Sequence, residues 1–127
     1  MQPTEVVLRV PADTSYVSLV RTAATAVSAQ ADFTVDALDD LRLAVDEACA
    51  LAISDAVAGS DITVTFRVDG PRVAIDVCAA SASGLPVATN TFAWTVLTAL
   101  VDAVETDVTD GTLRIHLHAH GIESVAS

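Results

Sequence analysis

The sequence predicts a two-layer α/β sandwich, in which a mixed, mostly antiparallel sheet carries three helices on one face. Four segments alternate apolar and polar residues, as strands with one buried face do, and three segments repeat apolar residues at helical spacing. Strands with one apolar face need helices on that side only, while the other face stays in water or meets a partner. The length of 127 residues fits one modest core, so we expect residues 1–127 to form a single domain.

The N-terminal segments predict a strand followed by a helix. Residues Glu5–Val10 alternate, and Pro11 ends the strand because proline cannot donate a hydrogen bond to a neighbouring strand. Asp13 is placed to cap a helix that runs to about Gln30. The inward face of this helix is expected to hold Tyr16, Leu19, Val20, Ala23, Ala24 and Val27.

A second helix is predicted between Thr34, which can cap its start, and Gly59, which can end it. Its inward stripe is expected to hold Leu38, Leu41, Val45, Ala48 and Ala52. Glu47 lies off that stripe, one turn before Leu51. This acid is therefore either a functional carboxylate or a solvated one with a structural role.

The second half of the chain predicts a hairpin, a loop, a helix and a strand. Residues 62–68 and 73–77 alternate on either side of an Asp-Gly turn, which is a strong hairpin signal. A loop rich in Ala and Ser spans 79–91, and a third helix is predicted from residue 92 to about 104. The last predicted strand covers 112–120.

The charge excludes some partners and favours others. The formal net charge is -11, and every Lys or Arg in the chain is an arginine. Such a surface repels nucleic-acid phosphates and anionic lipid, so we expect no direct nucleic-acid binding, and it attracts a basic protein partner. A genome-wide enrichment in Asp over Lys explains the same charge equally well, so the charge supports a basic partner without establishing one.

The cysteine count and the hydropathy predict a cytoplasmic protein with no membrane association. Cys49 and Cys78 are too few and too far apart for a zinc site or a disulfide framework, so both are expected to be free thiols. No apolar run reaches membrane-spanning length, and no basic segment precedes a hydrophobic stretch near the N-terminus.

Two segments resemble a known family. The second helix matches the pattern Asp-x-(Leu/Met)-x-x-Ala-Val-x-Glu-Ala-Cys-x-Asn-Ala at Leu41, Ala44, Val45, Glu47, Ala48, Cys49 and Ala52. This pattern is similar to that of the RsbW-like anti-sigma factors of the GHKL (histidine kinase/HSP90-like) ATPase superfamily. The segment Phe92–Leu100 resembles the third helix of mycobacterial and actinobacterial anti-sigma-F factors. The resemblance spans essentially the whole chain and implies the GHKL, or Bergerat-like, sandwich.

The resemblance implies a regulator of transcription in stress responses. Such a protein sequesters an alternative sigma factor and releases it when an anti-anti-sigma protein of the STAS type competes. Family members commonly dimerise, and a sheet with an uncovered face and an edge strand suits a homodimer. We expect the partner surface on the outer face of the first helix and the start of the second, at Ser18, Arg21, Asp36, Asp39 and Asp40.

The same resemblance raises the alternative of an active serine/threonine kinase that phosphorylates its anti-anti-sigma antagonist. In kinase members the second-helix glutamate acts as the base, so Glu47 is the candidate here. A family asparagine that helps to hold Mg²⁺ is replaced by Leu51, which has no oxygen to offer the cation.

Two further departures point to a degenerate ATP site. In the family, the Asp of an Asp-x-Gly-x-Gly run after the hairpin binds the adenine base. At this place the present chain has Ala79, Ala80 and Ser81. Asp76 is the carboxylate nearest that place and is a weak candidate for nucleotide binding. The family's second glycine run is replaced by 90–94, which contains no glycine to let phosphate approach the backbone. We therefore expect a pseudokinase with no cofactor, and ATP with Mg²⁺ only if the pocket still works.

Three histidines, His116, His118 and His120, alternate on the last predicted strand and so share one face of the sheet. Imidazoles in such a row can bind zinc or nickel, or can simply face solvent. Because metal sites usually draw ligands from two elements and no acid is spaced to complete this one, the sequence assigns no metal site.

Overall fold

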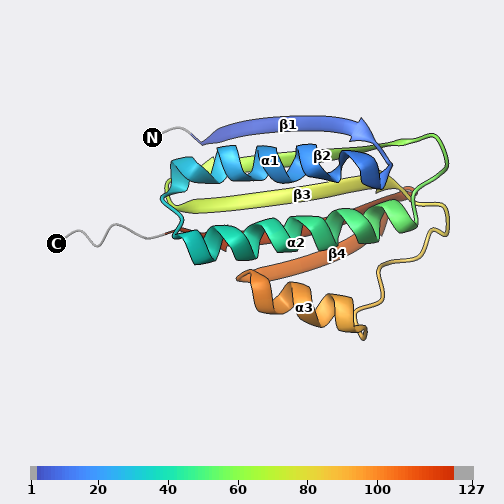
Figure 1. The fold of residues 1–127 in the computed structure, drawn as a ribbon. Helices are drawn as coiled ribbons and strands as arrows, with labels where there is room; N and C mark the ends of the chain where they lie inside the picture. Colours follow the sequence, from blue (N-terminus) through green and yellow to red (C-terminus); the bar gives the residue numbers. More distant parts are fainter. Residues whose placement is uncertain (1–2, 122–127) are drawn as a thin grey trace.

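Residues 3–121, which are the part of the chain that the computed structural model describes, fold into a five-stranded sheet with three α-helices over one face (Figure 1). The strands are β1 (Thr4–Pro11), β2 (Asp61–Asp69), β3 (Arg72–Ala80), β4 (Ala103–Thr109) and β5 (Thr112–His120). The helices are α1 (Val17–Ser28), α2 (Val35–Ser54) and α3 (Phe92–Leu100). The predicted two-layer sandwich is confirmed.

The sheet holds one strand more than the sequence predicted. The strand order is β1-β2-β3-β5-β4, and each neighbouring pair is antiparallel. β4 occupies residues that were assigned to the end of the third helix and the loop after it, so α3 ends at Leu100 and not near Val104. Because β4 reverses the chain before β5 begins, β5 runs antiparallel to β3, and the parallel pairing expected in a mixed sheet does not occur among residues 3–121.

The first helix starts as predicted, and four of its six predicted inward residues face the core: Val20 and Ala24 are buried, and Ala23 and Val27 are partly buried against it. The Asp13 carboxylate accepts a hydrogen bond from the Ser15 amide at 2.9 Å, and a short 3-10 turn leads into α1. The buried stripe of α1 runs through Val20, Ala24 and Ser28. Tyr16 and Leu19, which we expected to face the core, are 40% and 53% exposed. Tyr16 lies in the 3-10 turn before the helix, and the stripe through Val20, Ala24 and Ser28 leaves Leu19 on the outer side.

The second helix starts at the predicted cap and ends earlier than predicted. The Thr34 hydroxyl accepts a hydrogen bond from the Ala37 amide at 3.0 Å. The helix ends at Ser54, five residues before Gly59, because the next backbone amides bond elsewhere: the Val57 amide donates to the Ala80 carbonyl at 2.9 Å. Within residues 3–121, no helix is both long enough and apolar enough to cross a membrane.

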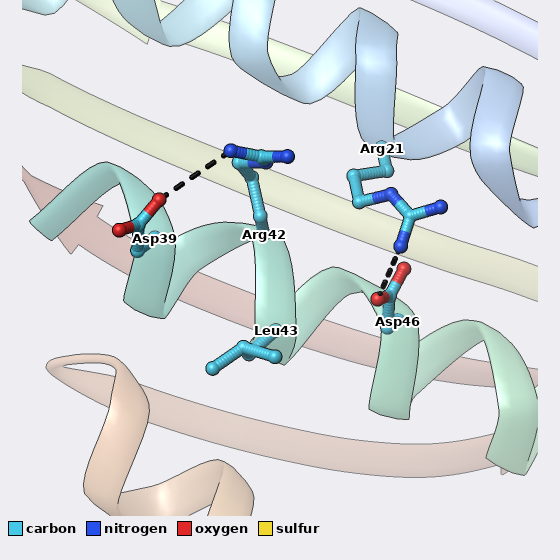
Figure 2. Close-up of a pocket in the computed structure, with 5 residues that line it drawn as sticks. All are labelled: Arg21, Asp39, Arg42, Leu43 and Asp46. Atoms are coloured by element: carbon cyan, nitrogen blue, oxygen red, sulfur yellow. Dashed lines mark hydrogen bonds and ion pairs between the residues drawn. The ribbon is translucent and has the colours of Figure 1, made fainter. Parts of the chain in front are cut away.

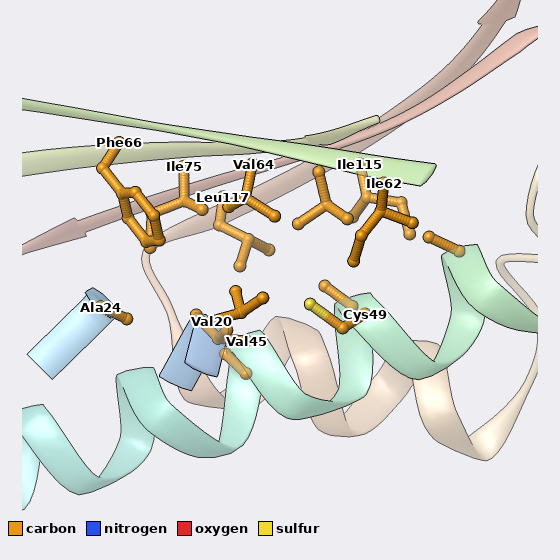
Figure 3. Close-up of a cluster of buried hydrophobic side chains, with 14 of the residues drawn as sticks. Val20, Ala24, Val45, Cys49, Ile62, Val64, Phe66, Ile75, Ile115 and Leu117 are labelled. Carbon is orange, nitrogen blue, oxygen red and sulfur yellow. The ribbon is translucent and has the colours of Figure 1, made fainter. Parts of the chain in front are cut away.

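The core lies between the helices and the inward face of the sheet (Figure 3). Small residues of α2 and α1 meet branched residues of the central strands, and Phe66 is the largest fully buried side chain. The fully buried residues labelled in Figure 3 are Val20, Ala24, Val45, Cys49, Ile62, Val64, Phe66, Ile75, Ile115 and Leu117. Alanines at the helix surface allow the helices to approach the sheet closely, which is how a chain with 4% aromatic residues builds a dense core.

Among residues 3–121 no helix covers the opposite face of the sheet (Figure 1). Ion pairs between neighbouring strands cross this face, among them Arg9 with Asp61 at 3.1 Å, Arg67 with Glu5 at 2.7 Å and Arg114 with Asp107 at 3.0 Å. Exposed pairs of this kind contribute little to stability, but they keep the open face soluble and fix its side chains.

Candidate functional site

A cleft of about 260 Å³ lies at the C-terminal end of α2, beside the loop that leads to α3. The residues that line it are Leu51, Ser54, Asp55, Ser83, Leu85, Pro86, Val87, Ala88 and Leu113. The resemblance to GHKL proteins places Mg²⁺ and the nucleotide phosphates next to the position of Leu51. The side chains there are largely apolar, and a hard cation needs oxygen ligands that Leu51 cannot supply.

The Asp55 carboxylate fastens the loop to the end of α2. It accepts hydrogen bonds from the Ser81 hydroxyl, from the Ser83 hydroxyl at 3.0 Å and from the Ser83 amide at 3.1 Å. The Ala82 amide also donates to the Asp55 carbonyl at 2.7 Å. We call this group of contacts between Asp55, Ser81 and Ser83 the Asp55 clasp. Hydrogen bonds from Ser81 and then Ser83 hold the pKa of the Asp55 carboxyl below its usual value, so the group is ionised at neutral pH.

Backbone amides at the start of α3 that could bind a phosphate already make hydrogen bonds within the protein. The Thr91 hydroxyl caps α3 and accepts a hydrogen bond from the Trp94 amide at 3.2 Å. No glycine occurs between Leu85 and Leu100, so every residue near this helix terminus carries a side chain that obstructs the access of a phosphate to the backbone. A phosphate-binding terminus instead leaves its first amides open and its backbone accessible.

Glu47 lies one turn before Leu51 on α2 and is half-buried. Within the described part of the chain its carboxylate makes no hydrogen bond and no ion pair. The two residues lie on one side of the helix, because positions four apart in a helix are neighbours. The structure thus brings the candidate base to the same side of α2 as Leu51, although Glu47 does not line the cleft itself.

Asp76, the weak candidate for nucleotide binding, is separated from this cleft by the sheet. On β3 its neighbours Ile75 and Val77 are buried under the helices, so Asp76 points to the open face. There its carboxylate pairs with the His116 imidazole on β5. Among residues 3–121 no cluster of three or more His, Cys, Asp or Glu side chains is already arranged to hold a metal ion.

A second hollow, of about 310 Å³, lies between α1 and α2 on the side away from the sheet (Figure 2). We call it the α1–α2 groove, and it is lined by Arg21, Asp39, Arg42, Leu43 and Asp46. Arg21 and Asp46 join the two helices through an ion pair at 2.9 Å, and Arg42 pairs with Asp39 at 3.4 Å. The other oxygen of Asp46, Oδ1, is buried without a hydrogen-bond partner.

The predicted partner-binding residues lie on or beside this groove. Arg21 and Asp39 line it, and Ser18, Asp36 and Asp40 are exposed on the same two helices. The structure adds apolar side chains that the sequence had placed elsewhere or left unassigned: Leu19 and Leu43 are each more than half exposed. Exposed leucines beside charged residues are typical of a protein-binding surface.

Sequence reasoning did not single out Asp55, the residue that organises the cleft. Ser81 had been noted only as one of the residues in place of the family's Asp-x-Gly-x-Gly run. The available signal was the spacing, since Asp55 follows Leu51 by one helical turn and therefore lies on the same side of α2.

Known proteins are similar to this chain in sequence and in fold. The histidine kinase-like ATPase domain family matches the chain over residues 10–117. The anti-sigma-F factor RsbW of Mycobacterium tuberculosis is 37% identical over 99 residues, which are 78% of this chain and 59% of that protein. The serine-protein kinase RsbW of Bacillus subtilis is 30% identical over 73 residues, 55% of this chain and 46% of that protein.

A solved structure, of the RsbU and RsbW domains of Rv1364c from Mycobacterium tuberculosis, superposes with a TM-score of 0.70. The superposition covers 97% of this chain and 35% of that chain at 18% identity, and it shows the shared fold. The chain spans between about half and three fifths of the length of the two RsbW proteins named above. Because the family match extends over most of its length, the chain belongs to the histidine kinase-like ATPase domain family.

Proposed function

We propose that this chain is an anti-sigma module that sequesters an alternative sigma factor and no longer uses ATP. A relative that is 37% identical is named an anti-sigma-F factor, which supports the sigma-binding role. The observation that supports loss of the nucleotide is the cleft at the end of α2, where Leu51 stands at the family's cation-binding position and the Asp55 clasp holds the loop against the helix.

The energetics of the cleft favour an empty site. A triphosphate brings several negative charges, and the ionised Asp55 carboxylate already lies at the cleft, so the two repel each other. Mg²⁺ normally offsets such repulsion, but the cation needs oxygen ligands and Leu51 provides none. An ATP molecule would therefore have to displace the serines of the clasp and would receive no cation ligand in return.

The partner surface is proposed to be the outer side of α1 and α2, around the α1–α2 groove. Asp36 and Asp40 are exposed near the start of α2 and give this surface negative charge. Leu19 and Leu43 supply apolar area that a partner would bury. Sigma factors present basic faces, so the signs are complementary, and release follows when a STAS-type protein competes for the same surface.

The sigma-binding role is tested by capture and reconstitution. The full chain is immobilised, proteins bound from the cytoplasm of its own organism are identified by mass spectrometry, and the captured protein is then purified and titrated. The proposal expects a sigma factor at one defined stoichiometry, with inhibition of transcription from its promoters. A captured set without any sigma factor contradicts the proposal.

The alternative function is that of an active serine kinase acting on a STAS antagonist, because relatives with 30–32% identity are named serine-protein kinases. Glu47, with no partner in the described part of the chain, would then be the base. Transfer of labelled phosphate from Mg-ATP to the antagonist, abolished by Glu47→Gln, would establish this function. Our proposal expects no transfer with either protein.

Self-association is also proposed, on the basis of the uncovered sheet face and the exposed edge strand β1. Val7 on β1 is 57% exposed on that face, where a second copy could cover it. Analytical ultracentrifugation measures this directly: a dimer supports the proposal, and a monomer at all accessible concentrations contradicts it.

A further inference from the structure

Two imidazoles meet on the open face of the sheet. His116 and His118 are alternate residues of β5, yet their Nε2 atoms lie 2.7 Å apart and their ring centroids 4.3 Å apart. Alternate side chains on a strand leave the backbone about 7 Å apart, so these two rings lean toward each other. The third histidine of the row, His120, instead pairs with Asp102.

The hydrogen bonds of His116 determine which of its two ring nitrogens carries the proton and which carries the lone pair. Its Nδ1 bonds the Asp76 carboxylate, and a carboxylate can only accept, so Nδ1 carries the proton. In the neutral ring Nε2 then accepts a hydrogen bond from the Nε2–H of His118, and a metal ion takes the place of that proton when His118 carries its N–H on Nδ1 instead. A carboxylate that holds the distal N–H of an imidazole is the arrangement that orients histidines in metal sites.

The surrounding charge favours a cation. Glu105 on β4 lies directly opposite His116, and Asp76 lies opposite it on β3, so two acids flank this imidazole on the same face. Two arginines also interact with Asp76, but each is paired with another acid, Arg67 with Glu5 at 2.7 Å and Arg114 with Asp107 at 3.0 Å. A chain with a net charge of -11 also raises the local concentration of cations.

We propose that His116 and His118 form a two-imidazole site for a borderline divalent metal ion of the Zn²⁺, Ni²⁺ or Cu²⁺ class. Imidazole nitrogen suits these ions. Two nitrogens on a tetrahedral zinc at its usual bond length lie roughly 3.3 Å apart, so the rings need to separate by only about 0.6 Å. The His118 side is exposed and can make that movement, and water molecules complete the coordination.

This site is independent of the proposed sigma-factor binding, because it lies on the opposite face of the sheet from the helices that are proposed to bind the partner. It shares that face with the surface proposed for self-association. A metal ion that is bound by only two protein nitrogens can exchange with solvent. The site is therefore not a structural one, since structural zinc sites use four protein ligands. The metal would therefore occupy the open sheet face without being needed for folding.

Zinc chloride is the probe, and calorimetry of the full chain is combined with nitrogen NMR of its histidine rings. We expect one Zn²⁺ per chain, with the Nε2 resonances of His116 and His118 shifting and those of His120 unchanged. His118→Ala should lower the affinity at least about tenfold, and Asp76→Asn by about tenfold through loss of ring orientation. His120→Ala is the matched control and should bind zinc as the unmodified chain does.

Three results would overturn the proposal: no zinc binding at millimolar metal, equal ring shifts at all three histidines, or equal losses in His118→Ala and His120→Ala. The NMR measurement needs no substitution, so it decides the matter even where a variant folds poorly.

Discussion

The carboxylate of Asp55, at the C-terminal cap of α2, accepts a hydrogen bond from the hydroxyl of Ser81, a residue 26 positions further along the chain. This contact joins the end of the helix to the end of β3, and Ser83 adds two more bonds to the same carboxylate. The clasp includes Ser81, one of the residues in place of the family's Asp-x-Gly-x-Gly run, and the proposed loss of ATP binding rests on it together with Leu51.

The clasp makes stability depend on pH in a defined direction. Because the pKa of Asp55 is lowered below 3.8 in the folded state, the folded protein holds the ionised form more tightly than the unfolded chain does. The stabilisation is present above pH 3.8 and is lost as the pH falls through the lower folded pKa. Urea midpoints of the unmodified chain and Asp55→Asn should therefore differ at pH 7, and the difference should shrink as the pH falls below 3.8 and through the lower folded pKa of Asp55. A constant difference across that range would contradict the assignment.

Phe66 tests where the core lies. It is fully buried between the sheet and the helices, so Phe66→Ala should lower the free energy of unfolding by about 3–5 kcal/mol through lost burial and cavity formation. Phe92, which is 84% exposed at the start of α3, is the matched control. Phe92→Ala should change the free energy of unfolding by less than about 0.5 kcal/mol. Chemical denaturation of the two variants gives both values, and similar losses would place the core elsewhere.

The two thiols should differ in reactivity. Burial, with a smaller contribution from the Asp46 carboxylate, raises the pKa of Cys49 to about 12, so almost no thiolate exists at pH 8. Cys78 on the open sheet face is only half-buried, and burial raises the pKa of its thiol too. Iodoacetamide followed by mass spectrometry should label Cys78 first and Cys49 only as the protein unfolds. Labelling of Cys49 at the same rate in the native state would show that α2 opens readily.

Charge reversal on the partner surface tests electrostatic steering. Asp40→Lys should slow association with a captured sigma factor several-fold at low salt, and the difference should shrink at high salt because the charge is exposed. Asp69→Lys changes the net charge equally but lies in the β2–β3 turn, so it should leave the association rate nearly unchanged. Stopped-flow measurements compare the two, and equal effects would mean that only the overall charge matters.

Much of this fold follows from local sequence signals. Alternation and an Asp-Gly turn predicted the β2–β3 hairpin, and capping residues predicted the starts of α1 and α2. The same kind of signal marks β4, where Val104, Thr106 and Val108 alternate before the turn at Asp110 and Gly111. That strand was missed because the strongly apolar third helix was extended over its first residues, and short apolar runs do not separate helix from strand.

The candidate site was less predictable, because it depends on contacts between distant segments. The sequence identified Leu51 as a departure from the family's cation site, and the structure places this residue in the cleft. It could not indicate that Asp55 meets Ser81 and Ser83, since that contact requires the packing of α2 against the end of β3. Asp76 was only a weak candidate for nucleotide binding from the sequence, and the structure sets it apart from the cleft, because Asp76 lies on the open side of the sheet.

The most direct test of the central claim is isothermal titration of the full chain with ATP, in the presence and absence of Mg²⁺. We expect no binding heat in either condition up to millimolar nucleotide. The cleft offers no cation ligand at Leu51, and the Asp55 clasp holds the loop against the end of α2. Magnesium-dependent binding in the micromolar range or tighter would contradict the claim and would favour an active kinase.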